Sequence, residues 1–202
     1  INNIANTVQC LRSAGFIIHP QKSVFIPSQE IQYIGFILSS KDMTVRLPPN
    51  KSANIKHVCQ KLLKKQRPTI QQVAEVVGKL VAAIPGVENG EMRYRLIDID
   101  KIKALKNAAG DYKMKMVLSN EAKSDLQWWA DNVQSTRKHI TRPTPTVTLQ
   151  TDASGLIGWG GLIAGQEKTK TGGQWSTDEQ DLHINVKELL AALFTLQSLC
   201  SN

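Results

Sequence analysis

The chain has 202 residues, of which 41% are hydrophobic and 21% charged, values typical of a soluble globular protein. Its 25 Lys and Arg exceed its 17 Asp and Glu, and the resulting formal net charge of +8 and pI near 9.5 favour polyanionic partners. Three widely spaced cysteines, Cys10, Cys59 and Cys200, indicate reduced thiols and argue against a disulfide framework or a zinc site.

No apolar run reaches the roughly 18 residues that a membrane-spanning helix needs, and no signal peptide is visible. We therefore expect an intracellular protein of the cytoplasm or nucleus, with no membrane partner. The chain begins with Ile1 rather than Met, which suggests a fragment, although a processed or trimmed chain looks the same.

The first part of the chain combines one helix with short β runs. Apolar spacing predicts a helix over 3–14 that ends at Gly15, after which residues 16–18 enter extended structure. Turns rich in Pro, Ser and Asp separate the three β runs that follow, which are 23–27, 31–38 and 43–47.

Residues 51–66 change to helical periodicity. The apolar stripe of this predicted helix consists of Ile55, Val58, Cys59 and Leu62. Between residues 51 and 67 there are six basic residues and no acid, and a cationic surface opposite the stripe is expected from Lys56, Lys61, Lys64, Lys65 and Arg67. A solvated face is the commoner role of such a run, but the basic front half favours phosphate contact.

The next helix has a clear beginning. Arg67-Pro68 breaks the preceding helix, and Thr69 with Gln72 forms a capping box. Inside the new helix, Gly78 costs about 1 kcal/mol relative to Ala in helix propensity, and the close approach of another helix is the simplest reason to tolerate it. The helix stops at Pro85-Gly86, and its buried residues are expected to be Ile70, Val73, Val77, Leu80 and Ile84.

Two further helices are predicted before residue 135. The first covers roughly 90–108 and ends near Gly110, and Ser119 opens the second. The apolar face of the second helix consists of Ala122, Leu126, Trp129 and Val133. This spacing predicts core packing for Trp129 and leaves the role of Trp128 open. Residues 135–146, rich in Arg, Lys and Pro, are predicted to be a linker.

Charge changes sign along the chain. Residues 1–110 hold 16 basic and 7 acidic side chains, residues 111–146 hold 6 and 4, and residues 147–202 hold 3 and 6. A basic front and an acidic back fit a phosphate-gripping region joined to a region whose carboxylates could hold metal.

Two carboxylates in the acidic region could share a metal ion. The strand predicted over 147–152 ends in Asp152 on its more polar face, and Glu188 follows Asn185 by three residues in the first turn of a helix. If that helix packs across the strand, the carboxylates converge, and Mg²⁺ is the expected cation between them. The structural alternatives are that Asp152 caps the following glycine turn and that Glu188 completes a capping box with Asn185.

Three motifs follow one another in this region: Asp-Ala-Ser with Gly-Trp-Gly-Gly within 152–161, Gly-Gly-Gln-Trp at 172–175 and His-Ile-Asn-Val-Lys-Glu-Leu at 183–189. Their order resembles the start of the ribonuclease H domain of retroelement reverse transcriptases, most closely of DIRS-type and related elements. The resemblance implies that Asp152 and Glu188 are the first two metal-binding carboxylates of a two-Mg²⁺ site for phosphodiester cleavage. The family's later carboxylates have no counterpart before Asn202, so the site is expected to be incomplete.

The front half contains two further motifs. Residues 11–23 read Leu-Arg-Ser-Ala-Gly-Phe-Ile-Ile-His-Pro-Gln-Lys-Ser, and residues 32–36 read Gln-Tyr-Ile-Gly-Phe. They resemble the end of the palm and the primer-grip hairpin of the same enzymes, which implies primer contacts by Tyr33 and Gly35; an ordinary packed hairpin is the alternative. The helices over 51–108 then match the thumb, which grips phosphates without reading bases.

The sequence therefore predicts an α/β (α+β) chain with four parts. These are the end of a palm over 1–48, a helical thumb over 49–110, a connecting segment over 111–146 and the N-terminal part of a ribonuclease H-like domain over 147–202. The resemblance implies a fragment of a retrotransposon Pol protein whose parent is an RNA-directed DNA polymerase with ribonuclease H (endonuclease) activity. The polymerases of this family use a metal-binding Asp pair in a Tyr-x-Asp-Asp motif, and this chain contains no Asp-Asp pair. It is therefore expected to bind an RNA–DNA hybrid or template–primer duplex but not to polymerise.

Three alternatives are open. The first is a non-enzymatic nucleic-acid-binding module from a decayed or co-opted element, and the second is a chain that completes its site with another polypeptide. An ATPase-like domain is disfavoured, because the sequence has no phosphate loop. An unfinished sheet edge also predicts self-association.

Overall fold

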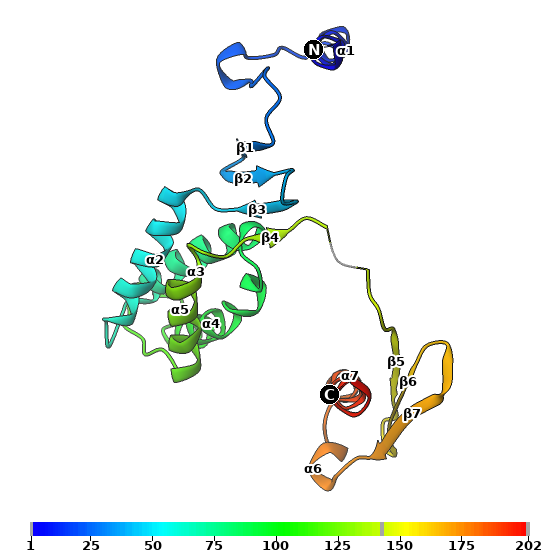
Figure 1. Ribbon diagram of the computed structural model, residues 1–202. Coiled ribbons are helices and arrows are strands. Elements are labelled where there is room, and N and C mark those ends of the chain that lie inside the picture. The colour runs from blue at the N-terminus through cyan, green and yellow to red at the C-terminus, as the bar shows by residue number, and fades with distance from the viewer. Residues whose placement is uncertain (1, 142–143, 201–202) are drawn as a thin grey trace. The chain divides into compact units, whose positions relative to one another are not determined.

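The computed structural model describes residues 2–141 and 144–200, and the chain forms two compact units, Ile1–Arg142 and Pro143–Asn202 (Figure 1). Both units combine helices with antiparallel strands, in agreement with the α+β class expected from the sequence. None of the helices in the described ranges is long and apolar enough to cross a membrane.

The first unit opens with a helix and a four-stranded antiparallel sheet. Helix α1 spans Asn2–Ser13, as predicted, and a 3-10 turn, η1, covers Pro20–Lys22. The strands lie in the order β1-β2-β3-β4 and are Glu30–Tyr33, Phe36–Ser39, Thr44–Arg46 and Lys138–His139.

The strand predicted over 23–27 is wrong. These residues lie outside any strand, and the side chains of Val24 and Ile26 are exposed. Pro27 lacks the N–H that a β ladder needs, and the segment has no neighbouring strand with which to pair. Apolar alternation alone therefore does not make a strand here.

Two other boundaries differ from the prediction because of long-range pairing. The run 31–38 is divided into β1 and β2 by a turn at Ile34 and Gly35, so this segment is a hairpin. The predicted linker 135–146 contains β4, which follows the helical region and pairs with β3.

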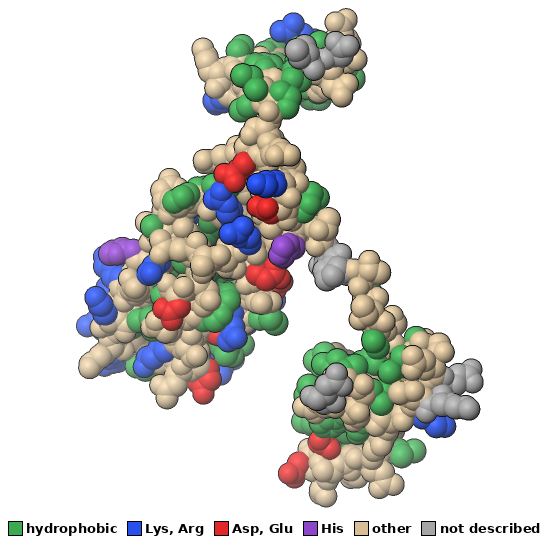
Figure 2. Space-filling view, in the orientation of Figure 1, with side chains coloured by type: hydrophobic (Ala, Val, Ile, Leu, Met, Phe, Trp, Pro, Cys, Tyr) green, Lys and Arg blue, Asp and Glu red, His purple; other side chains and the backbone are tan. Residues whose placement is uncertain are grey.

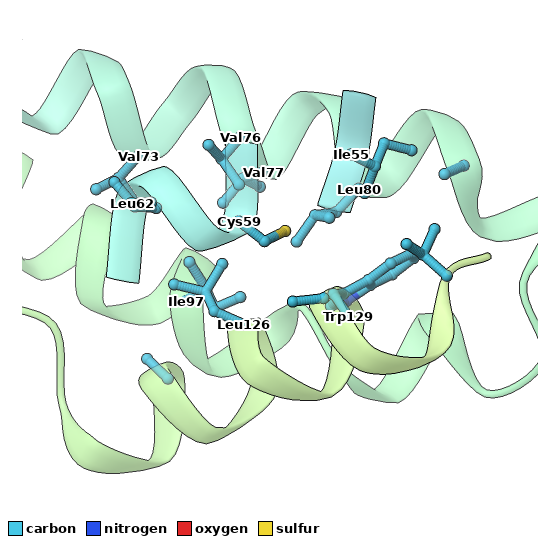
Figure 3. Close-up of a cluster of buried hydrophobic side chains, with 14 of the residues drawn as sticks. Ile55, Cys59, Leu62, Val73, Val76, Val77, Leu80, Ile97, Leu126 and Trp129 are labelled. Atoms are coloured by element: carbon cyan, nitrogen blue, oxygen red, sulfur yellow. The ribbon is translucent and has the colours of Figure 1, made fainter. Parts of the chain in front are cut away.

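Four described helices enclose the core of the first unit (Figure 3). They are α2 (Pro49–Leu63), α3 (Ile70–Ala83), α4 (Arg95–Asn107) and α5 (Asn120–Asn132). The 3-10 turns η2 (Ile84–Gly86) and η3 (Gly90–Met92) lie between α3 and α4. The apolar faces predicted for α2, α3 and α5 meet in this core, whose most buried members include Ile55, Cys59, Leu62, Ile70, Val73, Val77, Leu80, Ile97, Ala122, Leu126, Trp129 and Val133.

Side-chain caps begin two helices at the residues predicted from the sequence. Thr69 Oγ1 accepts the Gln72 N–H at 3.3 Å, and Gln72 Oε1 accepts the Thr69 N–H at 3.3 Å, which completes the capping box. Ser119 Oγ accepts the Ala122 N–H at 3.2 Å and donates to Asp100 Oδ2 at 2.7 Å.

The contact predicted for Gly78 is wrong. Gly78 is exposed on the outer side of α3, and a Cβ built on it would meet no atom within 4 Å. No helix therefore approaches it, and neither packing nor a positive φ requires a glycine there. Ile84, also predicted to be buried, is only half-buried because α3 ends at Ala83 and the chain turns into η2.

Gly78→Ala should stabilise the first unit by about 1 kcal/mol, because it improves helix propensity without a clash. Urea unfolding followed by circular dichroism should show a raised midpoint with an unchanged slope. Gly110→Ala is the matched control, since Gly110 has φ +89° and the same substitution there should destabilise. A lowered midpoint for Gly78→Ala would contradict the open environment of this residue.

The thiol of Cys59 is fully buried, and burial raises its pKa from 9.0 to about 12, whereas Cys10 and Cys200 are exposed. We expect a maleimide to label two thiols of the folded chain rapidly at neutral pH and Cys59 only when the first unit opens. Because the folded pKa is the higher one, the stability that this neutral thiol contributes is complete below pH 9.0 and is lost as pH rises towards 12. Peptide mass spectrometry measures the labelling, and rapid native labelling of Cys59 would contradict the packing.

The second unit is a three-stranded antiparallel sheet with a helix on one face. The strands lie in the order β5-β6-β7 and span Leu149–Ala153, Gly158–Ile163 and Gln166–Gln174. They are followed by a short helix α6 (Thr177–Gln180) and by α7 (Ile184–Cys200). The core is small, with Ala153, Trp175 and Ala191 buried and Trp159, Leu190 and Phe194 packed around them.

Candidate nucleic-acid interface and carboxylate pair

The turn between β1 and β2 forms an exposed, strained tip. Ile34 and Gly35 have φ values of 46° and 75°, so both lie in the left-handed region, as a two-residue hairpin turn of type I′ requires. That region is unfavourable for the β-branched Ile34, whose side chain is nevertheless 74% exposed. Tyr33 is 60% exposed beside it. A strained residue held at an exposed tip supports a contact role.

Lys51, in the first turn of α2, lies against this tip. Its Nζ is 4.4 Å from the ring centroid of Phe36 and 3.6 Å from the position that a Cβ on Gly35 would take. An ammonium group thus stands beside the turn that carries two of the predicted contact residues. Sequence reasoning missed Lys51, and the only signal available was its membership of the basic run.

The lysines predicted to form the cationic surface are spread over α2 and the two residues that follow it. Lys61 of α2 and Lys65, just after the helix, both line the space between α2 and α3, and at 3.6 residues per turn Lys51 lies near the same side of α2. Lys56 lies on the opposite flank and is half-buried, and Lys64 is exposed on the side away from the core. Figure 2 shows Lys and Arg side chains spread over the part of the first unit where α2 lies.

The side of α2 that adjoins α3 gathers positive charge from both helices. Lys61 and Lys65 line a hollow of about 180 Å³ between α2 and α3, and Lys79 of α3 donates to Asn54 Oδ1 of α2 at 3.0 Å. We name Lys51, Lys61, Lys65 and Lys79 the α2–α3 edge. Helix α3 has 14 residues and is therefore about 20 Å long, which matches the length of roughly six base pairs of a duplex.

The cations of the α2–α3 edge have no acidic partner among the described residues, where no ion pair within 4.0 Å includes them. Glu75 also lines the hollow and keeps its negative charge while its Oε1 accepts a hydrogen bond of 3.2 Å from Gln71, but the four lysines outnumber it. The edge is therefore open to an external polyanion. Arg67, the fifth residue of the predicted cationic surface, lines a different hollow together with Lys103 and Lys115.

The two adjacent tryptophans have structural roles. Trp129 is fully buried and donates from Nε1 to Arg93 O at 3.0 Å, which confirms its predicted core packing. Trp128 is half-buried and meets Trp129 edge-on, with ring centroids 5.7 Å apart. The Arg93 guanidinium lies 5.6 Å from the Trp128 centroid and pairs with buried Asp125 at 3.3 Å. Arg93 thus covers a ring that base stacking would need.

Asp152 lies on the sheet face that α7 does not cover. Its neighbour Thr151 pairs with Gly161, where a Cβ would lie 2.0 Å from Thr195 Oγ1 of α7. Because side chains alternate along a strand, Asp152 and its partner Gly160 face the other way. The carboxylate is exposed to solvent.

Neither structural alternative for the two carboxylates is realised. Ser154 rather than Asp152 caps the glycine turn, since its Oγ accepts the N–H groups of Leu156 and Ile157 at 3.3 and 2.8 Å. The Asn185 N–H is accepted by His183 Nδ1 at 3.2 Å, so Asn185 and Glu188 form no capping box. The nearby capping box belongs to Glu179, which accepts the Ser176 N–H at 2.8 Å and whose pKa is lowered by that bond.

Glu188 is exposed and lies just past the first turn of α7, because the helix begins at Ile184. Helix α7 packs on β5 and β6, so Asp152 and Glu188 stand on neighbouring elements. Within the described ranges, however, no three His, Cys, Asp or Glu residues gather as a metal site would require. Since Asp152 faces away from the helix that carries Glu188, the packing of α7 on the sheet does not by itself bring the two carboxylates together, and the described residues supply no further ligands for a catalytic metal.

A buried lysine joins the two segments that carry these carboxylates. Lys187 is 2% exposed, and its Nζ donates to Gly155 O, in the turn after β5, and to Gln180 O at 2.7 Å. The same ammonium lies 5.9 Å from the Trp175 ring centroid. Sequence reasoning missed this role, since a lysine beside Glu188 gives no sign of burial.

Comparison with known proteins supports the expected fold at a coarse level. No family model and no curated protein matches the chain. The chain is similar to a solved foamy viral protease-reverse transcriptase in complex with RNA/DNA hybrid, with a TM-score of 0.50 and 14% identity over 98% of this chain and 26% of the other. A second foamy viral structure, the protease-reverse transcriptase dRH in complex with ds DNA, has a TM-score of 0.46 and 16% identity to this chain. The similarity covers 95% of this chain and 32% of the other.

The chain thus spans between a quarter and a third of the length of these two solved chains. The first similarity shows a fold of the reverse-transcriptase type, which confirms the predicted resemblance at the level of fold. The assignment to DIRS-type elements is a finer prediction.

Proposed function

We propose that this chain is the nucleic-acid-gripping part of a retroelement Pol protein of the DIRS or a related type. In this proposal, residues 1–48 end a palm, 49–110 form a thumb, 111–146 connect, and 147–202 begin a ribonuclease H-like domain. The parent copies RNA into DNA and cuts the RNA strand of the hybrid. The chain itself binds a template–primer duplex or RNA–DNA hybrid through phosphates and does not polymerise.

The α2–α3 edge is the observation that carries the proposal. Its four lysines lie along two packed helices without acidic partners among the described residues, and Lys51 reaches the hairpin tip of Tyr33 and Gly35. The similarity of fold to a polymerase solved with an RNA/DNA hybrid is consistent with this use.

A salt titration of hybrid binding tests the proposal. The log of the binding constant should fall linearly with the log of the salt concentration, by about 0.9 for each phosphate bound. Replacing Lys51, Lys61 and Lys65 by Gln should weaken binding at least tenfold and reduce this slope by about 1 for each phosphate that is no longer neutralised. The control replaces Lys22, Lys41 and Lys170, which are exposed elsewhere, and removes the same charge. Equal weakening by both variants would refute a defined interface.

For the carboxylates, we propose that Asp152 and Glu188 are metal ligands of the parent enzyme. Their exposure and their freedom from capping roles support this, and Mg²⁺ would supply charge neutralisation for phosphodiester cleavage. The described residues do not complete such a site, so no cleavage step is assigned to the chain. This incompleteness favours the alternative of a non-enzymatic binding module for the isolated chain. Mg²⁺-dependent cutting of a labelled hybrid that disappears in Asp152→Asn would overturn that conclusion.

A further inference from the structure

A second hollow of the first unit collects three cations from three separate segments. Its volume is about 450 Å³. Arg67 comes from the connection between α2 and α3, Lys103 from α4, and Lys115 from the segment between α4 and α5. All three side chains are exposed. We name this feature the Arg67 hollow.

The main chain that carries two of these cations is held by hydrogen bonds. The Ile70 N–H donates to Met114 O at 3.0 Å, and the Met116 N–H donates to Pro68 O at 2.9 Å. These bonds flank a β-bridge between Thr69 and Lys115. The segments that carry Arg67 and Lys115 are therefore hydrogen-bonded to each other. This pairing holds the two side chains near one another.

Among the described residues that line the hollow, three cations outnumber a single carboxylate, which leaves a formal charge of +2. The acid that lines it is Asp100, whose Oδ2 accepts both the N–H and the Oγ–H of Ser119, at 2.8 and 2.7 Å, where α5 begins. Within the described ranges, no ion pair includes Arg67, Lys103 or Lys115. The basic residue in the last turn of α4 is Lys106 rather than Lys103, so complementing a helix end does not explain the convergence of the three cations.

We propose that the Arg67 hollow binds a backbone phosphate of nucleic acid, as an anchor separate from the α2–α3 edge. Arg67 supplies a planar fork of donors for the phosphate oxygens, and Lys103 and Lys115 supply point charges. Met114 and Val117 line the same hollow and are 52% and 62% exposed, so apolar surface is available to the sugar next to that phosphate. The proposal rests on the proposed binding of duplexes.

The test compares a variant in which Arg67, Lys103 and Lys115 are all replaced by Gln with the α2–α3 edge variant and the matched control of Lys22, Lys41 and Lys170. Binding of an RNA–DNA hybrid should be about tenfold weaker in the hollow variant, with a salt slope lower by about 1 for each phosphate that is no longer neutralised. Thermal unfolding of each variant, which should be unchanged, distinguishes weaker phosphate binding from damage to the fold. Combining the hollow and edge substitutions should multiply the two reductions in affinity.

The outcomes separate this inference from the proposed function. If the unsubstituted chain binds the hybrid and the hollow variant binds it as well as the control does, the hollow is not a phosphate anchor and the α2–α3 edge is the binding site alone. If the unsubstituted chain binds no duplex, the proposed function is wrong, whatever the hollow does. Competition arms with inorganic phosphate and with polyglutamate identify the source of the anion. Hollow-dependent binding of phosphate or polyglutamate without hollow-dependent binding of hybrid would overturn the nucleic-acid assignment.

Discussion

Gly161→Ala is expected to unfold the second unit. A Cβ at this position would lie 2.0 Å from Oγ1 and 2.4 Å from Cγ2 of Thr195, a fully buried residue of the helix that covers the sheet. Overpacking of this kind costs typically 1–3 kcal/mol, and the unit has only a small core to offset it. Urea unfolding monitored by tryptophan fluorescence should lose the transition of the second unit, while Cys59 in the first unit stays protected.

Gly160→Ala is a matched control on the same strand. A Cβ on Gly160 would have its nearest neighbour, Thr171 O, at 4.0 Å, so this variant should unfold close to the parental urea concentration. Thr195→Ala should partly rescue Gly161→Ala, because it removes the two atoms nearest to the new methyl group. If Gly161→Ala and Gly160→Ala were equally stable, α7 would not pack on the face assigned here, and Asp152 would not face away from it.

Lys187→Glu should be the most damaging charge reversal in the second unit. The substitution replaces an ammonium that donates to two carbonyl oxygens with a carboxylate that those oxygens repel, at a side chain only 2% exposed. An uncompensated buried charge costs roughly 3–5 kcal/mol, enough to unfold a unit of this size. Chemical denaturation with circular dichroism and tryptophan fluorescence measures the reduction in stability.

Two further variants isolate the cause of that reduction. Lys170→Glu makes the same charge change at an exposed position of β7 and should leave stability within about 0.5 kcal/mol of the parent. Lys187→Met keeps the apolar stem but not the donors, so it should fall between the parent and Lys187→Glu. Equal stability of Lys187→Glu and Lys170→Glu would show that the ammonium does not hold the Gly155 turn.

The helical part of the fold could be predicted from the sequence because its signals are local. The stripe of α2, the capping box of Thr69 and the start of α5 at Ser119 depend on residues within a few positions of each other, and all three agree with the structure. The strand errors have the opposite origin. Whether a run such as 23–27 becomes a strand depends on a partner elsewhere in the chain, and β4 exists only because β3 lies next to it.

The candidate sites show the same division. Asp152 and Glu188 could be placed on a strand and a helix from their immediate surroundings, and the helix does pack on that strand. Lys51 and Lys187 could not be identified, because their partners Phe36 and Gly155 lie 15 and 32 positions away in the sequence. Charge counting alone also treats all the lysines near α2 alike, whereas Lys61 and Lys65 line the space next to α3 and helix phase puts Lys56 on the opposite flank.

Lysine footprinting with a bound hybrid tests the central claim, that the α2–α3 edge is the nucleic-acid interface. The folded chain is acetylated with and without an RNA–DNA hybrid at low salt, and the modification of each lysine is quantified by mass spectrometry. The edge predicts protection of Lys51, Lys61, Lys65 and Lys79, with Lys22 and Lys41 modified as fast as in the free chain. Protection that is absent from the edge, or equal at all exposed lysines, would contradict the assignment of the interface to these two helices.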